Sequence, residues 1–393
     1  MMGTLFATTS ALIILLGLLY VSFMGWCALG WHRLLLRRHD PDSIDVPIVH
    51  GLVVSVIVPA RNEAERIRQC LDSILECDYP DECREVIVVD DGSTDGTGSI
   101  VRRRYAREIA EGSLCVIMIE RGAGKRSAIE AGVAAARGRY ILTTDADCTV
   151  APGWIAAMTS ELERGAPVVA GPVAYRHSDD DSPFARLQAL EFAGLVAVGA
   201  GSMANGLPTI CNSANLGYTR SIHRLWARRS GTELGAQAGN AAGADETIVL
   251  HARELSGSPS VFVLDRSAVV SADPSVSIAE FASQRIRWAS MGGRYPRFHV
   301  VAISALVFGF YAALVFAPAA GLWEAWLGAV GLKVAGDALL LAPSVRFFGA
   351  RPLLRLFAVG QLVHAPYVIG AATWGALVPT RWKDRLLDGS AAK

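Results

Sequence analysis

Two aspartates separated by one residue follow a segment that reads as a buried strand: Asp145 and Asp147 come after Tyr140 to Thr144. Side chains at i and i+2 of an extended chain point to the same side, so both carboxylates can face one point. Such oxygen ligands suit Mg²⁺ or Mn²⁺, which proteins commonly hold by carboxylates together with substrate phosphates. The alternative for Asp-x-Asp alone is a polar loop after a strand. With the motifs described next, the pair indicates a site for a nucleotide diphosphate.

Polar clusters of the same kind follow other predicted strands. Runs of aliphatic and β-branched residues predict strands over 53–59, 84–89, 114–119 and 140–144, with helices between them. This alternation predicts a parallel α/β sheet, which binds ligands beyond the carboxyl ends of its strands. Polar residues stand at those ends: Pro59 to Glu63, Asp90 to Ser93, Gly122 to Lys125 and Asp145 to Asp147. Asn62 is expected to cap the first helix, with Glu65 in the capping-box position.

Two of these clusters each have a chemical and a structural interpretation. Asp90 and Asp91 precede a glycine turn, so a carboxylate either accepts hydrogen bonds from a base or ribose or forms an Asx-type turn. The stretch Gly122-Ala-Gly-Lys125 either offers backbone N–H groups and an ammonium to a phosphate or is an ordinary helix start. The P-loop spacing is absent from it.

Two further clusters lie towards the C-terminus. Asp245 and Glu246 precede an apolar helical run, where they are either first-turn residues stabilised by the helix dipole or a general base. Gln284, Arg287 and Trp288 share one face of a predicted amphipathic helix. That face is either a juxtamembrane basic belt or a surface that holds a pyrophosphate leaving group and lines a sugar channel.

Apolar spans stand at both ends of the 393-residue chain, of which 52% is hydrophobic. Residues 1–31 carry no charge and meet the requirement of roughly 20 residues for a spanning helix, so we interpret 1–35 as a retained anchor and not a signal peptide. Apolar stretches within 298–380 predict about three more transmembrane helices, and a basic tail follows at 381–393. Lys333 and Asp337 stand four apart in the second of these stretches and are expected to pair with each other.

Arginines flank the spans and suggest an orientation. Arg33 follows the first span and Arg294 and Arg297 precede the second, so the positive-inside rule places the intervening residues in the cytoplasm, as in a multi-pass protein of the plasma (inner) membrane. Basic residues on both sides of the last span leave the sidedness of the C-terminus open. The segment 183–203 is apolar but contains charged residues, so we expect it not to span but to lie at the membrane interface or under the active site.

Composition bounds the remaining possibilities. The formal net charge of zero gives no indication of nucleic-acid binding. Seven cysteines without C-x-x-C spacing suit reduced thiols better than a disulfide framework or a zinc site.

Taken together, the motifs resemble those of the membrane-bound family-2 glycosyltransferases, which include cellulose, chitin and hyaluronan synthases and ceramide glucosyltransferases. The resemblance covers about residues 50–295 and is carried, in order, by Asp90-Asp91, Lys125, Asp145-x-Asp147, Asp245-Glu246 and Gln284-x-x-Arg287-Trp288. It implies a GT-A domain at 50–295, an inverting mechanism, an NDP-sugar donor (usually UDP) and a Mg²⁺ or Mn²⁺ ion.

The resemblance also implies roles for particular residues. Asp91 would lie near the nucleoside, and Asp147, with Asp145 beside it, would hold a metal that bridges the diphosphate. Arg287 and Trp288 would close over the leaving group and the acceptor site. The nucleotide-sugar side would further include Pro59, Glu63, Asp90, Lys125 and Gln284, and a loop at the sugar and acceptor would include Asn212, Ser213 and Asn215. The family's acidic pair usually ends in the Asp that acts as base; here Glu246 takes that position after Asp245, so which acid acts stays open.

The function expected from this resemblance is transfer of a single sugar to a membrane lipid or other hydrophobic hydroxyl acceptor by in-line displacement. The small number of C-terminal spans favours it over the first alternative, a processive polysaccharide synthase. An alternative from another class is a membrane protein that senses nucleotide-sugar without turnover, which the complete set of acids disfavours. The sequence leaves open the sugar, the acceptor, the choice between Mg²⁺ and Mn²⁺, and the oligomeric state.

Overall fold

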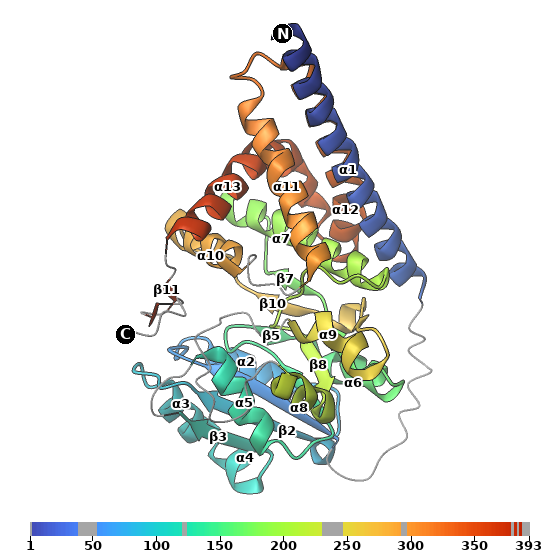
Figure 1. The fold of residues 1–393 in the computed structure, drawn as a ribbon. Coiled ribbons are helices and arrows are strands. Elements are labelled where there is room, and N and C mark those ends of the chain that lie inside the picture. Colours follow the sequence, from blue (N-terminus) through green and yellow to red (C-terminus); the bar gives the residue numbers. More distant parts are fainter. Residues whose placement is uncertain are drawn as a thin grey trace, which may run out of the picture. The chain divides into compact units, whose positions relative to one another are not determined.

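The fold of the chain is given by a computed structural model (Figure 1). It describes residues 2–37, 53–119, 124–229, 247–291, 297–378, 381–382 and 385–386. They form two compact units, each of which is described by itself. The helical unit comprises Met1–Arg33, His177–Thr209 and Pro274–Leu387, and the sheet unit comprises Leu34–Arg176 and Ile210–Asp273.

The sheet unit is built on a seven-stranded sheet in the order β3-β2-β1-β4-β8-β6-β9. Its strands are β1 Val54–Ala60, β2 Arg84–Asp90, β3 Leu114–Met118, β4 Tyr140–Thr143, β6 Val168–Ala170, β8 Leu216–Thr219 and β9 Val261–Phe262. Strands β1 to β4 run parallel to one another, β8 runs antiparallel to both β4 and β6, and β9 is parallel to β6. The predicted, mostly parallel sheet is confirmed, and each of the four predicted strands is found within one residue of its predicted ends.

Aliphatic side chains explain why the central strands are buried. Val56 of β1 lies in register with Val86 of β2 and with Leu142 of β4, and all three are fully or almost fully buried. A strand that is covered on both faces has no solvent-facing side, so its residues are apolar at successive positions and do not alternate with polar ones. A second sheet contains three short strands in the order β5 Thr149–Val150, β10 Val270–Ala272 and β7 Val173–Tyr175.

Short helices connect the strands of the sheet unit (Figure 1). Helix α5 contacts β1 and β2, and α6 contacts β4, β6 and β8. The helices are α2 Ile67–Leu75, α3 Thr97–Arg104, α4 Ala106–Glu111, α5 Lys125–Ala135, α6 Trp154–Glu163, α8 Arg220–Arg229 and α9 Thr247–Ser256, with the 3₁₀ turns η2 Asp81–Cys83 and η3 Arg266–Ala268.

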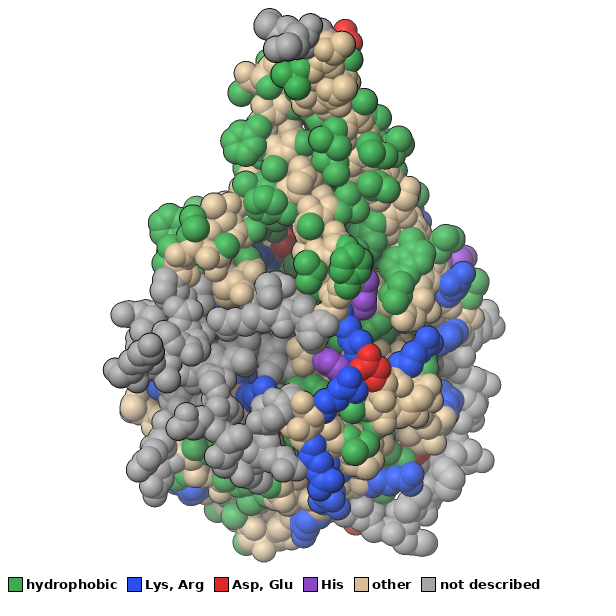
Figure 2. All heavy atoms as spheres, viewed as in Figure 1, with side chains coloured by type: hydrophobic (Ala, Val, Ile, Leu, Met, Phe, Trp, Pro, Cys, Tyr) green, Lys and Arg blue, Asp and Glu red, His purple; other side chains and the backbone are tan. Residues whose placement is uncertain are grey.

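Within its described residues, the helical unit contains five helices that are long and apolar enough to cross a membrane by length and composition. Its elements are α1 Met2–Leu36, α7 Pro183–Ala204, α10 Ile278–Met291, α11 Phe298–Phe316, α12 Trp323–Phe347, η5 Arg351–Leu356, α13 Phe357–Leu377 and the short strands β11 Arg381–Trp382 and β12 Arg385–Leu386. One N-terminal candidate, α1, and three C-terminal ones, α11, α12 and the segment Arg351–Leu377, agree with the prediction. Mainly hydrophobic side chains cover α1 and α11 in Figure 2, as expected of a membrane protein.

Helix α7 differs from its prediction. It meets the same criteria of length and hydropathy, so the judgement that 183–203 is too mixed to span was wrong on composition. Its most apolar window is 67% buried, against 11–33% in the other four candidates, because neighbouring helices of the unit cover it. Its position at the membrane interface stays a prediction. Both α7 and α10 belong to the helical unit. The observed division of the chain into two units therefore differs from the predicted single domain of 50–295.

Two glycines let α1 and α7 approach backbone to backbone. A Cβ at Gly30 would lie 2.1 Å from the carbonyl oxygen of Gly201, and a Cβ at Gly201 would lie 2.1 Å from the carbonyl oxygen of Cys27. Small residues allow this kind of packing between membrane helices. Asn205, at the end of α7, adds a hydrogen bond from its Nδ2 to the carbonyl of Trp26 at 2.7 Å.

The predicted pairing of Lys333 with Asp337 is confirmed. The two side chains are buried in α12 and form an ion pair of 2.7 Å. Gln361 of α13 accepts a second hydrogen bond from the Lys333 ammonium at 2.7 Å and donates to Asp337 Oδ2 at 2.8 Å.

Candidate active site

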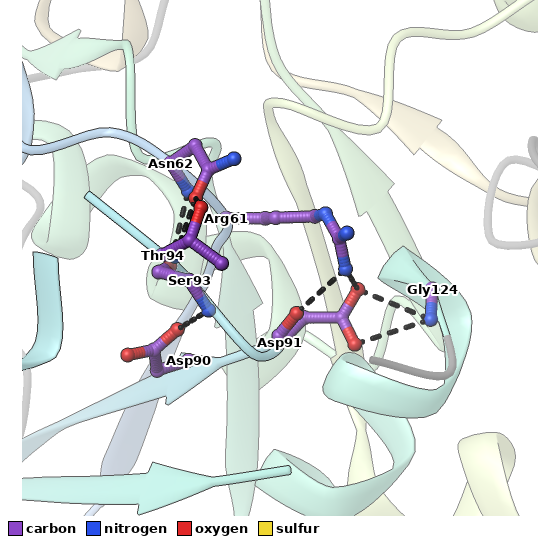
Figure 3. Close-up of polar contacts among 7 residues, drawn as sticks. All are labelled: Arg61, Asn62, Asp90, Asp91, Ser93, Thr94 and Gly124. Carbon is purple, nitrogen blue, oxygen red and sulfur yellow. Dashed lines mark hydrogen bonds and ion pairs between the residues drawn. The ribbon is translucent and has the colours of Figure 1, made fainter. Parts of the chain in front are cut away.

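Asp91 contacts two different loops within the polar cluster at the carboxyl ends of the central strands. This residue stands directly after β2 and is 2% exposed. The carboxylate accepts from the backbone N–H of Gly124 at 3.1 and 3.3 Å, and Arg61 Nη1 lies 3.7 Å from Asp91 Oδ2 (Figure 3). Arg61 also donates to the Asp91 carbonyl at 2.9 Å. Asp91 thereby ties the loop after β1 to the start of α5.

Gly124 is the residue whose conformation makes this contact possible. Its φ of 99° and ψ of 167° fall in a region that is essentially restricted to glycine. The amide of Gly124 faces Asp91, and α5 begins at the next residue, Lys125. The predicted helix start at Lys125 is therefore present, and the N–H of the residue before it bonds to Asp91.

Lys125 joins three segments of the sheet unit. Its Nζ lies 2.5 Å from Asp145 Oδ1 and donates to Ser213 Oγ at 2.7 Å. Thr143, the last residue of β4, donates to the Ser213 carbonyl at 3.3 Å and so fixes the loop that carries Ser213. The Lys125 and Asp145 side chains are 24% and 32% exposed, so a ligand from solvent can reach this ion pair.

Asp90, unlike Asp91, forms the structural alternative that its sequence context allowed. Its Oδ1 accepts from the backbone N–H of Ser93 at 2.9 Å, which closes an Asx-type turn (Figure 3). A Cβ at Gly98 would lie 2.4 Å from Asp90 Oδ2, so the carboxylate packs against the start of α3. Direct contact of Asp90 with a nucleotide stays a prediction.

The expectation that Asn62 caps α2 was wrong. Helix α2 begins at Ile67, and Asn62 has a φ of 52° in the loop before it. Its side-chain oxygen accepts from the Thr94 backbone N–H at 2.8 Å, and its own N–H donates to Ser93 Oγ at 3.0 Å (Figure 3). Asn62 fastens the loop after β1 to the loop after β2, because Asn tolerates the left-handed conformation that most residues avoid.

Asp145 and Asp147 stand half-buried just after β4, as predicted. The Cys148 thiol, a weak donor, bonds to Asp147 Oδ1 at 3.4 Å. Burial raises the pKa of the Cys70 thiol, and the nearby Asp147 and Asp145 carboxylates raise it further. The same causes raise the pKa of Cys148, so both thiols stay protonated around this pair of carboxylates.

The donor set at Asp147 suits a cation that takes most of its ligands from elsewhere. Among the described residues no group of three or more His, Cys, Asp or Glu gathers in a way that could hold a metal ion. Mg²⁺ and Mn²⁺ are commonly bound by one or two carboxylates, with phosphate oxygens and water completing the shell. Two half-buried carboxylates beside a lysine fit that mode of binding and do not fit a metal cage made of protein alone.

Arg176, at the end of β7, lies in the same region and was not predicted. Its Nε donates to Asp273 Oδ1 at 2.5 Å and its Nη1 to Thr149 Oγ1 at 2.9 Å. The hydrogen bond between Arg176 and Asp273 lowers the pKa of Asp273 and raises the pKa of Arg176, and the Cys148 and Asp147 groups add smaller contributions to the raised pKa of Arg176. A guanidinium therefore stands near Asp147. No motif in the sequence distinguishes Arg176 from the other arginines.

The predicted acceptor loop divides into different roles. Ser213 contacts Lys125, whereas Asn212 accepts from the Ala214 N–H at 2.9 Å and shapes the loop. Asn215 is fully buried, and its amide bonds to Trp154 Nε1 at 2.9 Å and to the carbonyls of Pro172 and Ala268 at 2.9 and 2.8 Å. Because all three bonds are made within the protein, Asn215 has a structural role within the predicted loop.

The other predicted site residues lie elsewhere in the structure. Pro59 is in β1, and the half-buried Glu63, in the loop after it, donates its N–H to Thr97 Oγ1 at 2.9 Å. Gln284, Arg287 and Trp288 lie on α10 of the helical unit. The proposed bases lie outside the described residues: Asp245 and Glu246. The structure thus brings together Asp91, Lys125, Asp145 and Ser213 within the sheet unit.

Comparison with known proteins identifies the domain that carries this site. The family described as glycosyl transferase family 2 matches residues 55–226. Residues 55–226 are a family-2 glycosyltransferase domain. They contain the strands and loops that place Asp91, Lys125, Asp145 and Ser213. The predicted family is therefore confirmed.

Named relatives of this glycosyltransferase domain match a smaller part of the chain. Glycosyltransferase AglE of Haloferax volcanii is 35% identical over 118 residues, 30% of this chain and 36% of that protein. The dodecaprenyl-phosphate galacturonate synthase of Rhizobium johnstonii is 37% identical over 118 residues, 30% of this chain and 34% of that protein. The undecaprenyl-phosphate 4-deoxy-4-formamido-L-arabinose transferase of Proteus mirabilis is 35% identical over 117 residues, 30% of this chain and 35% of that protein. The matches therefore span about a third of each curated relative.

A solved structure confirms the fold of the glycosyltransferase domain and its helices. The mannosyltransferase PcManGT from Pyrobaculum calidifontis, in complex with GDP-Man and Mn²⁺, superimposes with a TM-score of 0.52 at 21% sequence identity. The match covers 93% of this chain and 99% of that one. The predicted GT-A fold is confirmed by this likeness and by the mostly parallel sheet.

Proposed function

We propose that the protein is an inverting glycosyltransferase that moves one sugar from an NDP-sugar to a lipid acceptor in the membrane. The observation that carries this proposal is the position of the Lys125 ammonium between Asp145 Oδ1 and Ser213 Oγ, at the carboxyl ends of parallel strands. Ligands of open α/β sheets bind at that edge, and a lysine held there suits a diphosphate. The apolar helices of the same chain are suited to hold the protein in a membrane, where a lipid acceptor resides.

In the proposed reaction an acceptor oxygen attacks the anomeric carbon of the sugar while the bond from that carbon to the diphosphate breaks. The NDP leaves with the bonding electron pair, and the configuration at the carbon inverts. Lys125 would stabilise the departing diphosphate through its ammonium, and Asp91 would accept hydrogen bonds from the nucleoside. By the family resemblance, Arg287 would contact the leaving group and Trp288 would line the acceptor site. Asp147, with Asp145, would hold Mg²⁺ or Mn²⁺, which supplies positive charge to the leaving group when bound.

The acceptor chemistry decides whether a base is needed. A lipid hydroxyl must lose its proton, and Glu246 or Asp245 would take it. A lipid phosphate is already an anion and needs no base. Polyprenyl phosphates are the first acceptors to test, because two of the relatives are named for them.

The donor and the orientation follow from similar reasoning. UDP-sugars are proposed as donors in line with the family resemblance, and GDP-mannose is included because PcManGT was solved with it. The positive charges at Arg33 and Arg297 support a glycosyltransferase domain that faces the cytoplasm from the plasma (inner) membrane.

A donor screen tests the proposal. Membranes that contain the protein are incubated with labelled UDP-glucose, UDP-galactose, UDP-N-acetylglucosamine, UDP-glucuronic acid or GDP-mannose, together with polyprenyl phosphate or a hydroxyl-bearing lipid extract. We expect one sugar per lipid and loss of transfer with EDTA or in the Asp147→Asn variant. Asp180→Asn, in the exposed acidic run before α7, is the matched control and should keep wild-type activity. A long water-soluble polymer would instead support a processive synthase, and donor binding without any product would support a sensor.

A second comparison separates the two acceptor chemistries. The Glu246→Gln and Asp245→Asn variants should lose most transfer to a hydroxyl acceptor, since the base is gone, but should retain transfer to a phosphate acceptor. Wild-type rates to a hydroxyl lipid in both variants would rule out both acids as the base.

A further inference from the structure

The most deeply buried side chain of the Gln284-to-Trp288 stretch belongs to a residue that the motif does not include. Arg285 is 5% exposed, whereas Gln284, Arg287 and Trp288 are each half-buried. Long charged side chains are rarely buried unless they are paired. The partners of Arg285 therefore show what holds this part of α10.

The Arg285 guanidinium lies between two aromatic rings and beside a carboxylate. Its Cζ lies 4.6 Å from the ring centroid of Phe281 and 4.2 Å from that of Trp288, both on α10. It also forms an ion pair with Glu191 of α7. Arg285 and Trp288 are three positions apart and share one face of the helix. The ring of Trp288 is therefore stacked against a cation that is itself fixed by another helix.

Glu191 has a second partner, from a third helix. Tyr367 of α13 donates its hydroxyl to Glu191 Oε1 at 2.6 Å, and its ring lies 5.4 Å from that of Phe281. The side chains of Glu191 and Arg285 are 13% and 5% exposed. We name Glu191, Arg285 and Tyr367 the Glu191 clamp. It joins α7, α10 and α13 through one carboxylate.

The backbones of α10 and α13 also approach closely beside the clamp. A Cβ at Gly375 would lie 2.8 Å from the carbonyl oxygen of Ile286 and 3.0 Å from the amide of Ser290. This contact sets the distance between the two helices, whereas the clamp grips a side chain and so sets the rotation of α10 about its axis. Rotation decides where Arg287, two positions beyond Arg285, and the Trp288 ring point.

We propose that Glu191, Arg285 and Tyr367 are positioning residues for glycosyl transfer, which orient Trp288 and Arg287 by fixing the rotation of α10. The inference rests on the proposed function, in which Arg287 and Trp288 contact the leaving diphosphate and the acceptor. A buried ion pair adds little net stability over well-packed apolar residues, so a role in orientation accounts better for a charged clamp.

The test compares charge, shape and packing at the clamp in the full-length protein in membranes. Arg285→Lys keeps the charge but loses the flat guanidinium between two rings. The triple variant Glu191→Leu/Arg285→Met/Tyr367→Phe replaces the clamp by apolar groups of similar size. The control is Glu85→Gln/Arg137→Met, which removes an ion pair with a buried carboxylate in the sheet unit. The readouts are kcat and KM for the active donor, calorimetric UDP binding, thermal unfolding, and the ¹⁹F resonance of 5-fluorotryptophan-labelled Trp288, assigned by its loss in Trp288→Phe.

We expect kcat to fall about tenfold in Arg285→Lys and about 100-fold in the triple variant, because displacements near 1 Å can cost that much. UDP binding and the unfolding midpoint of the triple variant should stay near wild type, and the Trp288 resonance should shift in both clamp variants but not in the control. Wild-type kcat in Arg285→Lys together with an unshifted resonance would overturn the proposal. If no donor is turned over by the wild type, the proposed function fails and the resonance alone decides whether the clamp orients Trp288. If the triple variant does not fold, Arg285→Lys and Tyr367→Phe give the decision.

Discussion

Replacement of Lys125 by methionine should separate catalysis from stability. The Lys125–Asp145 ion pair is short, at 2.5 Å, but its two side chains are 24% and 32% exposed. Water and salt screen such a pair, so its removal should cost at most about 1 kcal/mol of unfolding free energy. The hydrogen bond to Ser213 at 2.7 Å is about as small a contribution, near 1 kcal/mol.

The effect on transfer should be much larger. A preorganised donor aimed at charge that develops in the transition state is typically worth 10²- to 10³-fold in rate, or about 3–4 kcal/mol. The Lys125→Met variant should therefore lose about 100-fold or more in kcat/KM for the NDP-sugar. Release of the nucleoside diphosphate is measured against donor concentration, and unfolding is measured in parallel by heat or denaturant.

The control for this prediction is Arg107→Met, which breaks the exposed ion pair with Glu111 on α4 and leaves the cluster intact. It should keep the wild-type kcat/KM. The reasoning is refuted if Lys125→Met keeps kcat/KM within threefold of wild type, since Lys125 would then be a structural residue. A large loss of stability in Lys125→Met would refute it in another way, because the loss of activity would then report unfolding.

Three further variants test other parts of the sheet unit. Asn215→Ala should lower the unfolding free energy by about 4 kcal/mol, measured by denaturant titration, because three buried hydrogen bonds are lost and their partners are left unsatisfied; a loss under 1 kcal/mol would contradict its structural role. Gly124→Ala should cost about 1–3 kcal/mol from backbone strain alone, since a Cβ there meets no atom within 4 Å, and should raise KM for the donor by moving an amide away from Asp91. Burial and the nearby Arg126 cation lower the pKa of His223 to about 4, so the unfolded state binds more protons between about pH 6.5 and 4. Stability should therefore fall by about 3 kcal/mol as the pH drops through that range, and His223→Phe should flatten the fall; an unchanged slope in that variant would assign the effect to other groups.

The sequence predicts the four parallel strands well because each is an aliphatic run that is buried on both faces, such as Val54–Ala60. It does not predict β8, because Leu-Gly-Tyr-Thr is short, contains a glycine and lacks a periodic pattern. Leu142 and Val169 fill the space that a side chain at position 217 would need, so only glycine fits there. This is a tertiary effect that no local sequence pattern records.

For the candidate site, residue type and position at a strand end were sufficient to predict that Asp91, Lys125 and Asp145 lie at one edge of the sheet, and their roles stay predictions. The same reasoning did not distinguish the structural amide of Asn215 from the other polar side chains of its loop, since a buried amide and a ligand-binding amide look alike in sequence. It also passed over Arg285, which stands inside the motif but points to Glu191. The bonding partners of Asn215 and Arg285 distinguish them, and those partners are known only from the folded chain.

The close approach of α1 and α7 at Gly30 and Gly201 has a consequence for how the N-terminal helix is regarded. A helix that only tethers a protein to a bilayer is interchangeable with any other apolar helix of equal length. In a replacement helix, any side chain larger than hydrogen at the position of Gly30 would clash with the carbonyl oxygen of Gly201 and push the helix outward. Helix α1 is thus a specifically packed part of the helical unit. Exchange of this helix should disturb the packing of α7 even where attachment to the membrane survives.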